Sequence, residues 1–275
     1  MLSIFIATLG RQRLITLEQF PTELLRKTVL VTNLAQRAEL ARRYPDTTVV
    51  HCPYQPEPGE KVDGFTKGLS PVRQWIANQF RGKVIIADDD LTFQVRLEPM
   101  VPFKTRPAEA FDMVRLIEDM SDLSKRYAMV GLAHRSGSNR ITERLVHAHR
   151  MHNIWSVDLT LMNRLGIRFD AVPTMQDFWV HLGFLSEGYN TAMICNRLYN
   201  PAASNAAGGC SLYRTNVTQR ISVGRIVQRF PEFTKLVTKE TKGGWFGNEP
   251  RIDVHVQWKK ALQHGLDKRQ NDDIL

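Results

Sequence analysis

The sequence predicts an α/β fold in which a layered sheet is connected by crossover helices. Short apolar runs alternate along the chain with segments whose apolar residues recur at helical spacing. Such alternation is typical of strands joined by helices. Residues 83–87 are apolar after Lys83, as expected of a central strand that is buried on both faces. With 275 residues and 43% hydrophobic content, the chain can bury a substantial core.

The first part of the chain reads as a regular series of strands and helices. Predicted strands are residues 3–8, 28–32, 47–52 and 83–87, and predicted helices are residues 15–20, 34–44 and 71–80. Residues 53–65 hold three prolines and two glycines, so a loop is expected there. Ser70 as N-cap, with Pro71 at the first helical position, starts the third helix. Residues 1–95 are therefore expected to form a Rossmann-like nucleotide-binding half.

The second part contains another strand–helix–strand series. Residues 156–163 read as a strand, 165–170 as a turn, 178–186 as a helical segment and 191–195 as a returning strand. Thr174 is the expected N-cap of the helix, which ends at Gly188. Asp177 then lies in the first helical turn. A carboxylate there is favoured by the helix dipole, so a purely structural role is the competing interpretation.

Composition narrows the setting and the partners. The chain has 37 Lys and Arg against 28 Asp and Glu, a net charge of +9, which favours a polyanionic partner or an anionic cofactor. Its three widely spaced cysteines suggest neither zinc nor disulfides, so a reducing cytoplasm is expected. The apolar run at residues 2–7 is too short for a signal peptide, and no membrane span is visible.

Asp88, Asp89 and Asp90 follow the predicted central strand directly and are the most informative stretch. Acids at the exposed tip of a strand can hold Mg²⁺ or Mn²⁺ against a phosphate, because these ions prefer carboxylate oxygen. The competing interpretation is a solvated turn, where Asp is common. Three adjacent like charges should raise at least one pKa unless a cation or a basic neighbour compensates them.

Ligands of such sheets lie outside the carboxyl ends of the strands. Candidate donor-binding residues from the other strand ends and loops are Thr8, Gly10, Arg11, Lys67 and Arg73. Gly10 would let the backbone approach a base or phosphate, and an arginine could pair with a diphosphate. For any one basic residue, plain surface exposure is the alternative.

The order of these motifs resembles that of metal-dependent GT-A glycosyltransferases over roughly residues 1–200. The resemblance rests on the strand ending in Asp88–Asp90, on Phe169-Asp170, and on Gln176-Asp177 at the head of a helix that closes with residues 187–191. It implies one GT-A-like domain over residues 1–275, with an acceptor-binding half and C-terminal extension from residue 96. It also implies a UDP-sugar or other nucleotide-sugar donor.

The resemblance also assigns roles to individual residues. Asp88 and Asp90 match the DxD motif that binds Mn²⁺ or Mg²⁺ and the donor diphosphate, with Asp89 between them. Asp177 matches the base of inverting members, which would take the proton from the acceptor hydroxyl. The family commonly has Glu-Asp there, whereas this chain has Gln176, which removes one flanking charge. If Asp177 lay far from the acceptor, a retaining route would remain open.

Such enzymes often take a further metal ligand, frequently His, from near the C-terminus. The alternation in residues 252–258 puts Asp253 and His255 on the face opposite Ile252 and Val254. His255 is therefore a candidate third ligand and Asp253 its competitor, although a lone His is more often a surface or hydrogen-bonded residue.

The basic surplus, the size and the basic loop at residues 135–140 look like the phage-type glycosyltransferases that modify hydroxymethylated pyrimidines in DNA. Such an acceptor base would have to leave the duplex. Trp245 and Phe246 are candidate stacking platforms, whereas Trp155 and Trp179 read as core, and residues 206–211 read as a lid or a connector. Two other classes stay open: a nucleotidyltransferase on a related sheet, and a non-catalytic nucleic-acid-binding protein whose acids are turn residues.

Overall fold

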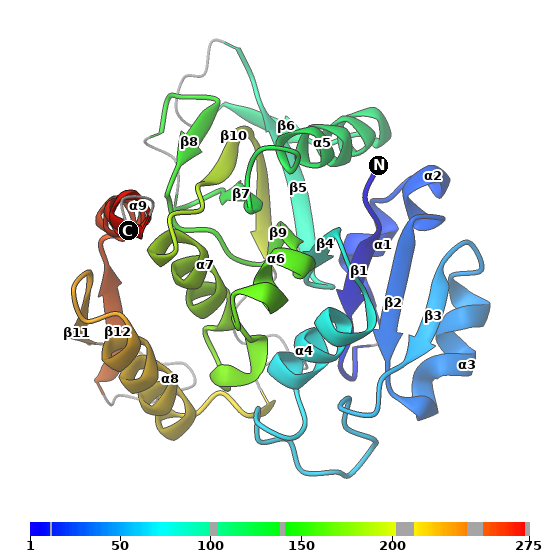
Figure 1. Cartoon of the computed structure of the whole chain (residues 1–275). Coiled ribbons are helices and arrows are strands. Elements are labelled where there is room, and N and C mark those ends of the chain that lie inside the picture. The colour runs from blue at the N-terminus through cyan, green and yellow to red at the C-terminus, as the bar shows by residue number, and fades with distance from the viewer. Residues whose placement is uncertain (12, 99–103, 138–140, 202–211, 241–249, 273–275) are drawn as a thin grey trace.

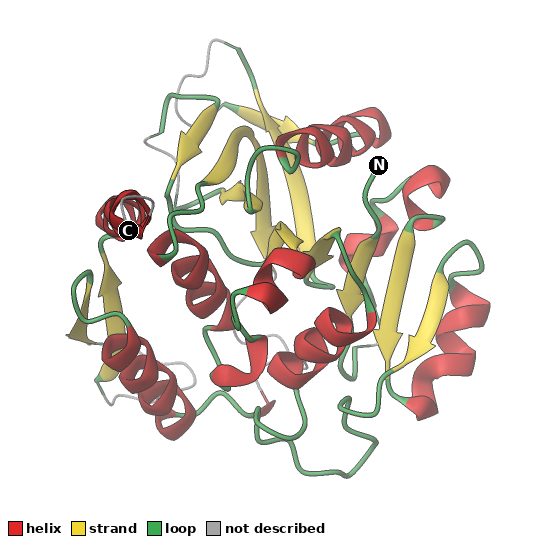
Figure 2. Ribbon diagram, in the orientation of Figure 1, coloured by secondary structure: helices red, strands yellow, loops and turns green. Residues whose placement is uncertain are grey.

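A large sheet crosses the molecule and carries helices on both faces (Figures 1 and 2). The computed structural model describes residues 1–11, 13–98, 104–137, 141–201, 212–240 and 250–272. Within these ranges, the sheet follows the strand order β3-β2-β1-β4-β9-β7-β10-β5-β6, with β8 paired to β10. A separate pair of strands, β11 and β12, lies outside it.

The elements have the following bounds. The strands are β1 (Ile4–Ala7), β2 (Thr28–Thr32), β3 (Thr48–His51), β4 (Lys83–Ala87), β5 (Leu91–Arg96), β6 (Thr105–Pro107), β7 (Met129–His134), β8 (Leu145–His147), β9 (Ile154–Asp158), β10 (Thr191–Pro201), β11 (Thr234–Lys239) and β12 (Arg251–Val256). The helices are α1 (Ile15–Glu18), α2 (Thr22–Leu25), α3 (Leu34–Arg43), α4 (Leu69–Gln79), α5 (Ala110–Leu123), α6 (Leu159–Arg164), the short 3₁₀ turn Phe169–Ala171, α7 (Gln176–Ser186), α8 (Asn216–Arg229) and α9 (Trp258–Asp272).

The N-terminal part forms the predicted Rossmann-like arrangement. Strands β3, β2, β1 and β4 run parallel to one another. β4 is buried from Val84 to Ala87, as its apolar sequence predicts for a strand covered on both faces. The α4 helix lies over the sheet beside these strands (Figure 1). The carboxyl ends of the parallel strands therefore point to one edge.

The second part turns the sheet into a mixed one. β9 pairs antiparallel with both β4 and β7, whereas β10 runs parallel to β7 and antiparallel to β5. The end of β4, the start of β9 and the ends of β7 and β10 consequently meet at the same edge. This confirms the predicted fold class, an α/β architecture, and shows that its central sheet is mixed.

Two apolar cores sandwich the sheet. One contains the stacked rings of Trp155 and Phe169, whose centroids are 5.6 Å apart, under α4, α6 and α7. The other lies under α5 and contains Ile85, Leu132 and Ile194. Alternate residues of the central strands supply the two cores, because successive side chains of a strand point to opposite faces.

Several local predictions were wrong. Residues 156–163 are not one strand: β9 ends at Asp158, whose side chain accepts a hydrogen bond from Leu161 N and thereby caps α6. The N-cap of α4 is Gly68 rather than Ser70, and that of α7 is Met175 rather than Thr174. The predicted strand at residues 252–258 is also shorter, since α9 begins at Trp258. Short apolar stretches suit both a strand and a buried helix, so local pattern cannot place such boundaries.

The C-terminal elements pack beside α7 and α8. β11 and β12 form an antiparallel pair that contacts α8, and α9 packs against α7. At this crossing, an added Cβ on Gly265 would lie 2.2 Å from both Gly188 N and Leu185 O, so only glycine allows this approach. None of the helices in the described ranges is long and apolar enough to cross a bilayer.

Candidate active site at the carboxyl edge of the sheet

The Asp88–Asp90 tip lies at the end of β4 and is held by Thr16 of α1. The Thr16 hydroxyl donates to Asp88 O at 2.7 Å and accepts from Leu91 N at 2.9 Å. Thr16 N also donates to Asp89 O at 3.1 Å. These bonds pair backbone groups of Asp88, Asp89 and Leu91, so the backbone that carries the three carboxylates is held in one conformation.

Each carboxylate of the tip is paired with a basic side chain. Arg73 of α4 lies 2.6 Å from Asp88 Oδ1, and its guanidinium stacks over the ring of Trp155 at 5.1 Å. Arg11, which follows β1, lies 3.0 Å from Asp89 Oδ1 and 2.7 Å from Asp90 Oδ2. These two arginines therefore hold the acids in place, where the sequence predicted that they would contact a donor.

Two of these acids, Asp89 and Asp90, nevertheless have raised pKa values. Burial raises the pKa of Asp89 to about 7, against the opposing effect of Arg11 and of the Thr8 hydroxyl. Burial, followed by the charge of Asp88, also raises the pKa of Asp90. The predicted rise is present, but desolvation contributes more to it than repulsion between the acids.

A polar cluster adjoins the tip and comes from strands far apart in the sequence. Asn153, just before β9, donates from Nδ2 to Asp88 Oδ2 at 2.7 Å, and its Oδ1 contacts His152 Nδ1. The same His152 nitrogen lies 2.8 Å from the hydroxyl of Tyr199 on β10. His134, the last residue of β7, stacks on His152 with ring centroids 5.5 Å apart.

Sequence reasoning did not identify this cluster as a site. The sequence patterns assigned no role to any of its four residues. One feature of the sequence could have indicated it: His134 stands at the end of an apolar strand, and the Asp triplet directly follows another. We call His134, His152, Asn153 and Tyr199 the edge cluster.

Asp177 lies near the edge cluster, in the first turn of α7. Met175 before it has φ of 60°, a left-handed conformation that is unusual for a residue with a side chain. Burial and the positive charge of Arg150 lower the pKa of His152, while the carboxylates of Asp177 and then Asp88 act in the opposite direction. The fold therefore brings the two predicted acids within electrostatic range of the same histidine, although they are far apart in the sequence.

The remaining donor candidates lie around the tip. Thr8 is buried at the end of β1, next to Asp89. Gly10 has φ of 66° and open space where a Cβ would stand, which leaves room at the backbone. Lys67 is bound to its own loop, since its Nζ lies 2.9 Å from both Glu60 Oε2 and Pro53 O.

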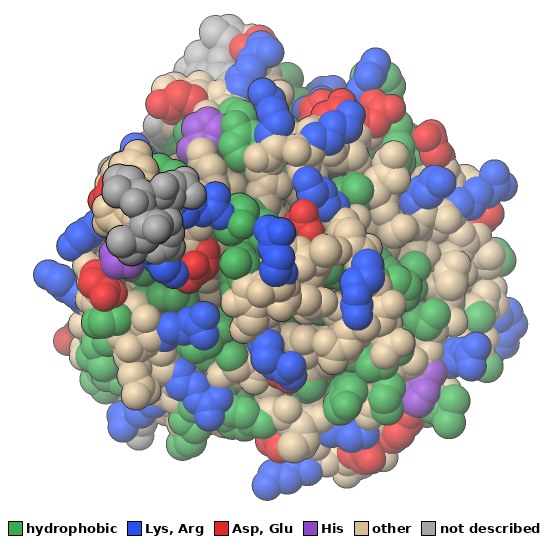
Figure 3. Space-filling model, viewed as in Figure 1, with side chains coloured by type: hydrophobic (Ala, Val, Ile, Leu, Met, Phe, Trp, Pro, Cys, Tyr) green, Lys and Arg blue, Asp and Glu red, His purple; other side chains and the backbone are tan. Residues whose placement is uncertain are grey.

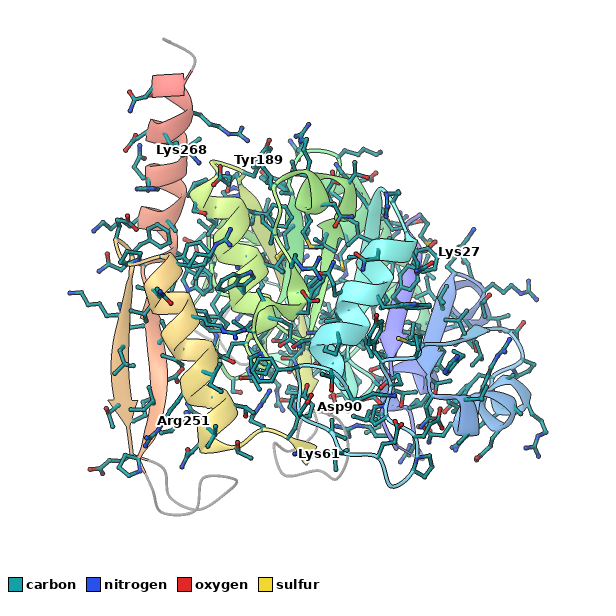
Figure 4. All side chains as sticks on the ribbon, turned by 60° about the horizontal axis from the view of Figure 1, so that its bottom comes forward. Lys27, Lys61, Asp90, Tyr189, Arg251 and Lys268 are labelled. Carbon is teal, nitrogen blue, oxygen red and sulfur yellow. The ribbon has the colours of Figure 1, made fainter. Side chains whose placement is uncertain are left out.

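The structure does not bring His255 to the tip, which corrects the prediction of a third ligand. His255 lies exposed on β12, opposite Lys235 of β11. Figure 4 shows Asp90 under α4 and Arg251, the first residue of β12, apart from it beside α8. The competing candidate, Asp253, is paired with Lys239 and Arg251.

The predicted aromatic and loop candidates divide into two groups. Trp155 is fully buried and Trp179 is 8% exposed, so both belong to the core as expected. Trp245, Phe246, residues 206–211 and residues 138–140 lie outside the described residues.

The donor atoms of the tip suit a hard divalent cation. Asp88 and Asp90 supply carboxylate oxygens, the ligands that Mg²⁺ and Mn²⁺ prefer, and their side chains are 23% and 13% exposed. Across the described ranges, no three His, Cys, Asp or Glu side chains form a group that could hold a metal by themselves. The protein would therefore supply one or two carboxylates, and substrate and water would supply the rest, as is usual for Mg²⁺ bound with phosphates.

Comparison with known proteins yields similarity of fold. No protein-family model matches the sequence, and no curated protein matches it. Among solved structures, a mycobacterial protein has a TM-score of 0.49 at 9% identity, over 93% of this chain and 83% of that chain. GalNAc-T7 solved with UDP, GalNAc and Mn²⁺ has a TM-score of 0.46 at 11% identity, over 82% of this chain and 47% of that chain.

A third structure, 4-diphosphocytidyl-2C-methyl-D-erythritol synthase from Anaerococcus prevotii, has a TM-score of 0.41 at 11% identity. It matches 71% of this chain and 88% of that chain. The neighbours thus include glycosyltransferases and nucleotidyltransferases. At these identities and TM-scores, the likeness concerns the fold and carries no argument about activity.

Proposed function

We propose that this chain is a cation-dependent glycosyltransferase that moves a sugar from a nucleotide-sugar, most simply a UDP-sugar, to a hydroxyl group. The observation that supports this most is that Asp88 and Asp177 both lie within electrostatic range of His152, while Asn153 links His152 to Asp88 by hydrogen bonds. Asp88 follows a strand end, where diphosphates bind in such sheets, and Asp177 lies in the first turn of α7.

The donor side of the reaction would use the Asp88–Asp90 tip. Asp88 and Asp90 would hold Mn²⁺ or Mg²⁺, which supplies positive charge against the leaving diphosphate. Arg73 and Arg11 keep the carboxylates in place, and Asp89 stays buried beneath them. The open space at Gly10 would admit a phosphate or base close to the backbone.

The acceptor side would use Asp177. As the hydroxyl oxygen attacks the anomeric carbon, its proton passes to the Asp177 carboxylate, and the bond from that carbon to the diphosphate oxygen breaks. A single displacement of this kind inverts the anomeric configuration. His152 and Tyr199 of the edge cluster lie within electrostatic range of both acids and would border the reacting groups.

For the acceptor, we propose a hydroxymethylated pyrimidine in DNA as the substrate to test first. The net charge of +9 supports a polyanionic partner. Figure 3 shows Lys and Arg side chains spread over the face that carries α4, α6, α7 and α8. Some of them have packing roles: Arg229 stacks on Trp179 at 4.8 Å, and Arg225 donates to Ala171 O at 2.6 Å. We also propose a reducing cytoplasm, because Cys52 and Cys195 are buried and free.

The decisive experiment incubates the protein with Mn²⁺ and a panel of nucleotide-sugars, with hydroxymethylated or plain DNA. Release of a nucleoside diphosphate, with a mass gain only in the modified DNA, is the expected result. Release without a DNA mass change would move the acceptor to water, a saccharide or a lipid. No release with any donor would contradict sugar transfer.

A nucleotidyltransferase is the second candidate, because it too would place its acids and cation at a strand end. Its substrate would be a nucleoside triphosphate, and its product would be free diphosphate. A glycosyltransferase would instead release a nucleoside diphosphate. If the chain is instead a non-catalytic nucleic-acid-binding protein, a third outcome is expected. The Asp88→Ala and Asp90→Ala variants would bind DNA as the unmodified protein does, and none of these forms would bind metal.

A further inference from the structure

Residues 152–154 form a strained turn immediately beside the tip. Ile154 N donates to His152 O at 2.8 Å, which closes a three-residue γ-turn around Asn153. Asn153 has φ of 66°, the sign of the rare form of this turn. A left-handed conformation is unfavourable for a residue with a side chain and persists only where surrounding contacts demand it.

The contacts that hold the turn lead to Asp88. Asn153 O accepts from Asp88 N at 2.9 Å, while Asn153 Nδ2 donates to Asp88 Oδ2 at 2.7 Å. One residue thus binds both the backbone and the side chain of the first acid. An asparagine at φ near 66° can reach both groups, since asparagine tolerates this conformation better than most residues.

This geometry also determines the tautomer of His152. A carboxylate only accepts hydrogen bonds, so the amide nitrogen of Asn153 must face Asp88. The amide oxygen then faces His152 Nδ1, and that nitrogen must carry a hydrogen. Burial, followed by the charge of Arg150, lowers the pKa of His152, which favours the neutral ring. In a neutral ring with hydrogen on Nδ1, Nε2 carries the lone pair.

Two further side chains fix the histidine ring. The Tyr199 hydroxyl lies 2.8 Å from His152 Nδ1, and the ring of His134 stacks on that of His152. His134 is held in turn by Gly137 N, which donates to its Nδ1 at 3.1 Å. Residues of β7, of β10 and of the turn before β9 therefore combine to orient one amide against Asp88.

We propose that His152 and Asn153 are positioning residues, which hold the Asp88 carboxylate in the direction needed to bind a divalent cation. The inference rests on the proposed function for the identity of the ion, but the orientation itself is independent of catalysis. Neighbours that orient a metal ligand through a hydrogen bond commonly change metal affinity about 10–100-fold when they are removed.

The first test compares Asn153→Gly with Ala148→Gly, using titration with Mn²⁺ in the presence of UDP. Both replacements relieve a positive φ, of 66° at Asn153 and 44° at Ala148, but only the first removes the amide. We expect about 10–100-fold weaker Mn²⁺ binding for Asn153→Gly and a change within about twofold for Ala148→Gly. Equal affinity in the Asn153→Gly variant would overturn the proposal.

A second test keeps the proposal falsifiable if Asn153→Gly fails to fold. His152→Asn retains a donor near the position of Nδ1, whereas His152→Ala removes it, so Mn²⁺ affinity should survive in the first and fall in the second. A general packing role would instead weaken both variants alike, which would contradict the proposal.

The tautomer supplies a readout that needs no metal. Nitrogen-15 NMR of the unmodified protein should show His152 protonated at Nδ1, and Asn153→Gly should release that preference. An Nε2–H ring in the unmodified protein would overturn the positioning role. If the tautomer is as expected but no Mn²⁺ binds with UDP, the proposed cation fails while the orientation of Asp88 stands.

Discussion

Asp253 and the two tip acids Asp89 and Asp90 have pKa values shifted in opposite directions. Asp253 on β12 accepts from Lys239 Nζ at 2.7 Å, Arg251 at 2.9 Å and Val254 N at 2.9 Å. Burial tends to raise its pKa, but the hydrogen bond from Lys239 and those that follow outweigh burial, and the pKa is lowered. At the tip, Asp89 and Asp90 also have a basic partner, yet burial prevails and raises both pKa values.

The difference separates a structural ion pair from a candidate site. The donors around Asp253 favour its charged form, so nothing further is needed there. Arg11 is shared between two acids of the tip, and among the described residues the buried Asp89 Oδ2 has no hydrogen-bond partner. An added cation would lower the cost of charging these acids, which is why strongly perturbed carboxylates in a recess are candidates for function.

The largest effect on turnover should come from neutralising Asp177. We predict that Asp177→Asn keeps donor binding and loses about 10²–10⁴-fold in turnover, because no carboxylate would take the acceptor proton. The measurement is nucleoside diphosphate release under saturating donor, with Asp253→Asn as the control that retains turnover. Unchanged turnover in Asp177→Asn would remove it as the base.

Metal affinity should distinguish the same two regions. We predict that Asp88→Asn and Asp90→Asn each weaken Mn²⁺ binding by about tenfold or more, because each removes a charged oxygen from the proposed ligand set. His255→Ala, a change at an exposed position of β12, should leave the Mn²⁺ affinity unchanged. Loss of binding in His255→Ala would restore that residue as a ligand.

The C-terminal elements can be perturbed without touching the tip. Gly265→Ala should lower the free energy of unfolding by about 1–3 kcal/mol, because its Cβ would meet backbone atoms of Gly188 and Leu185 at 2.2 Å. Gly224→Ala on α8 meets nothing within 4 Å and should raise stability by about 0.5–1 kcal/mol. Chemical denaturation measures both. Equal effects would show that the close approach is not maintained in solution.

The pH dependence of stability should have opposite signs at the two groups. The pKa of Asp89 is raised to about 7 from 3.8, so its contribution is present below pH 3.8 and is lost as pH rises through about 7. The lowered pKa of Asp253 gives a contribution that is present above pH 3.8 and is lost in acid.

Comparing Asp89→Asn and Asp253→Asn with the unmodified protein across this pH range should reveal both trends, with an effect of about 4 kcal/mol at most for Asp89. A flat difference between Asp89→Asn and the unmodified protein from pH 4 to 7 would contradict the raised pKa of Asp89.

Much of the fold could be predicted from local pattern. The central strand at Lys83–Ala87, the helix of residues 34–43 and the loop rich in proline and glycine all follow from periodicity and turn residues. The strand expected at residues 156–163 was wrong because Asp158 ends β9 with a side-chain cap that the apolar pattern hides. Likewise, strict alternation at Asp253 and His255 indicated a strand correctly but could not say which sheet it would join.

By itself, the sequence determined that three acids follow a buried strand and that another acid opens a helix, because those facts depend on neighbours along the chain. Only the tertiary structure decided that Arg11 and Arg73 would serve the acids, and that His134, Asn153 and Tyr199 would meet around His152. The reason is strand order: β4, β9, β7 and β10 are neighbours through crossovers, and no local propensity encodes which strand ends share an edge.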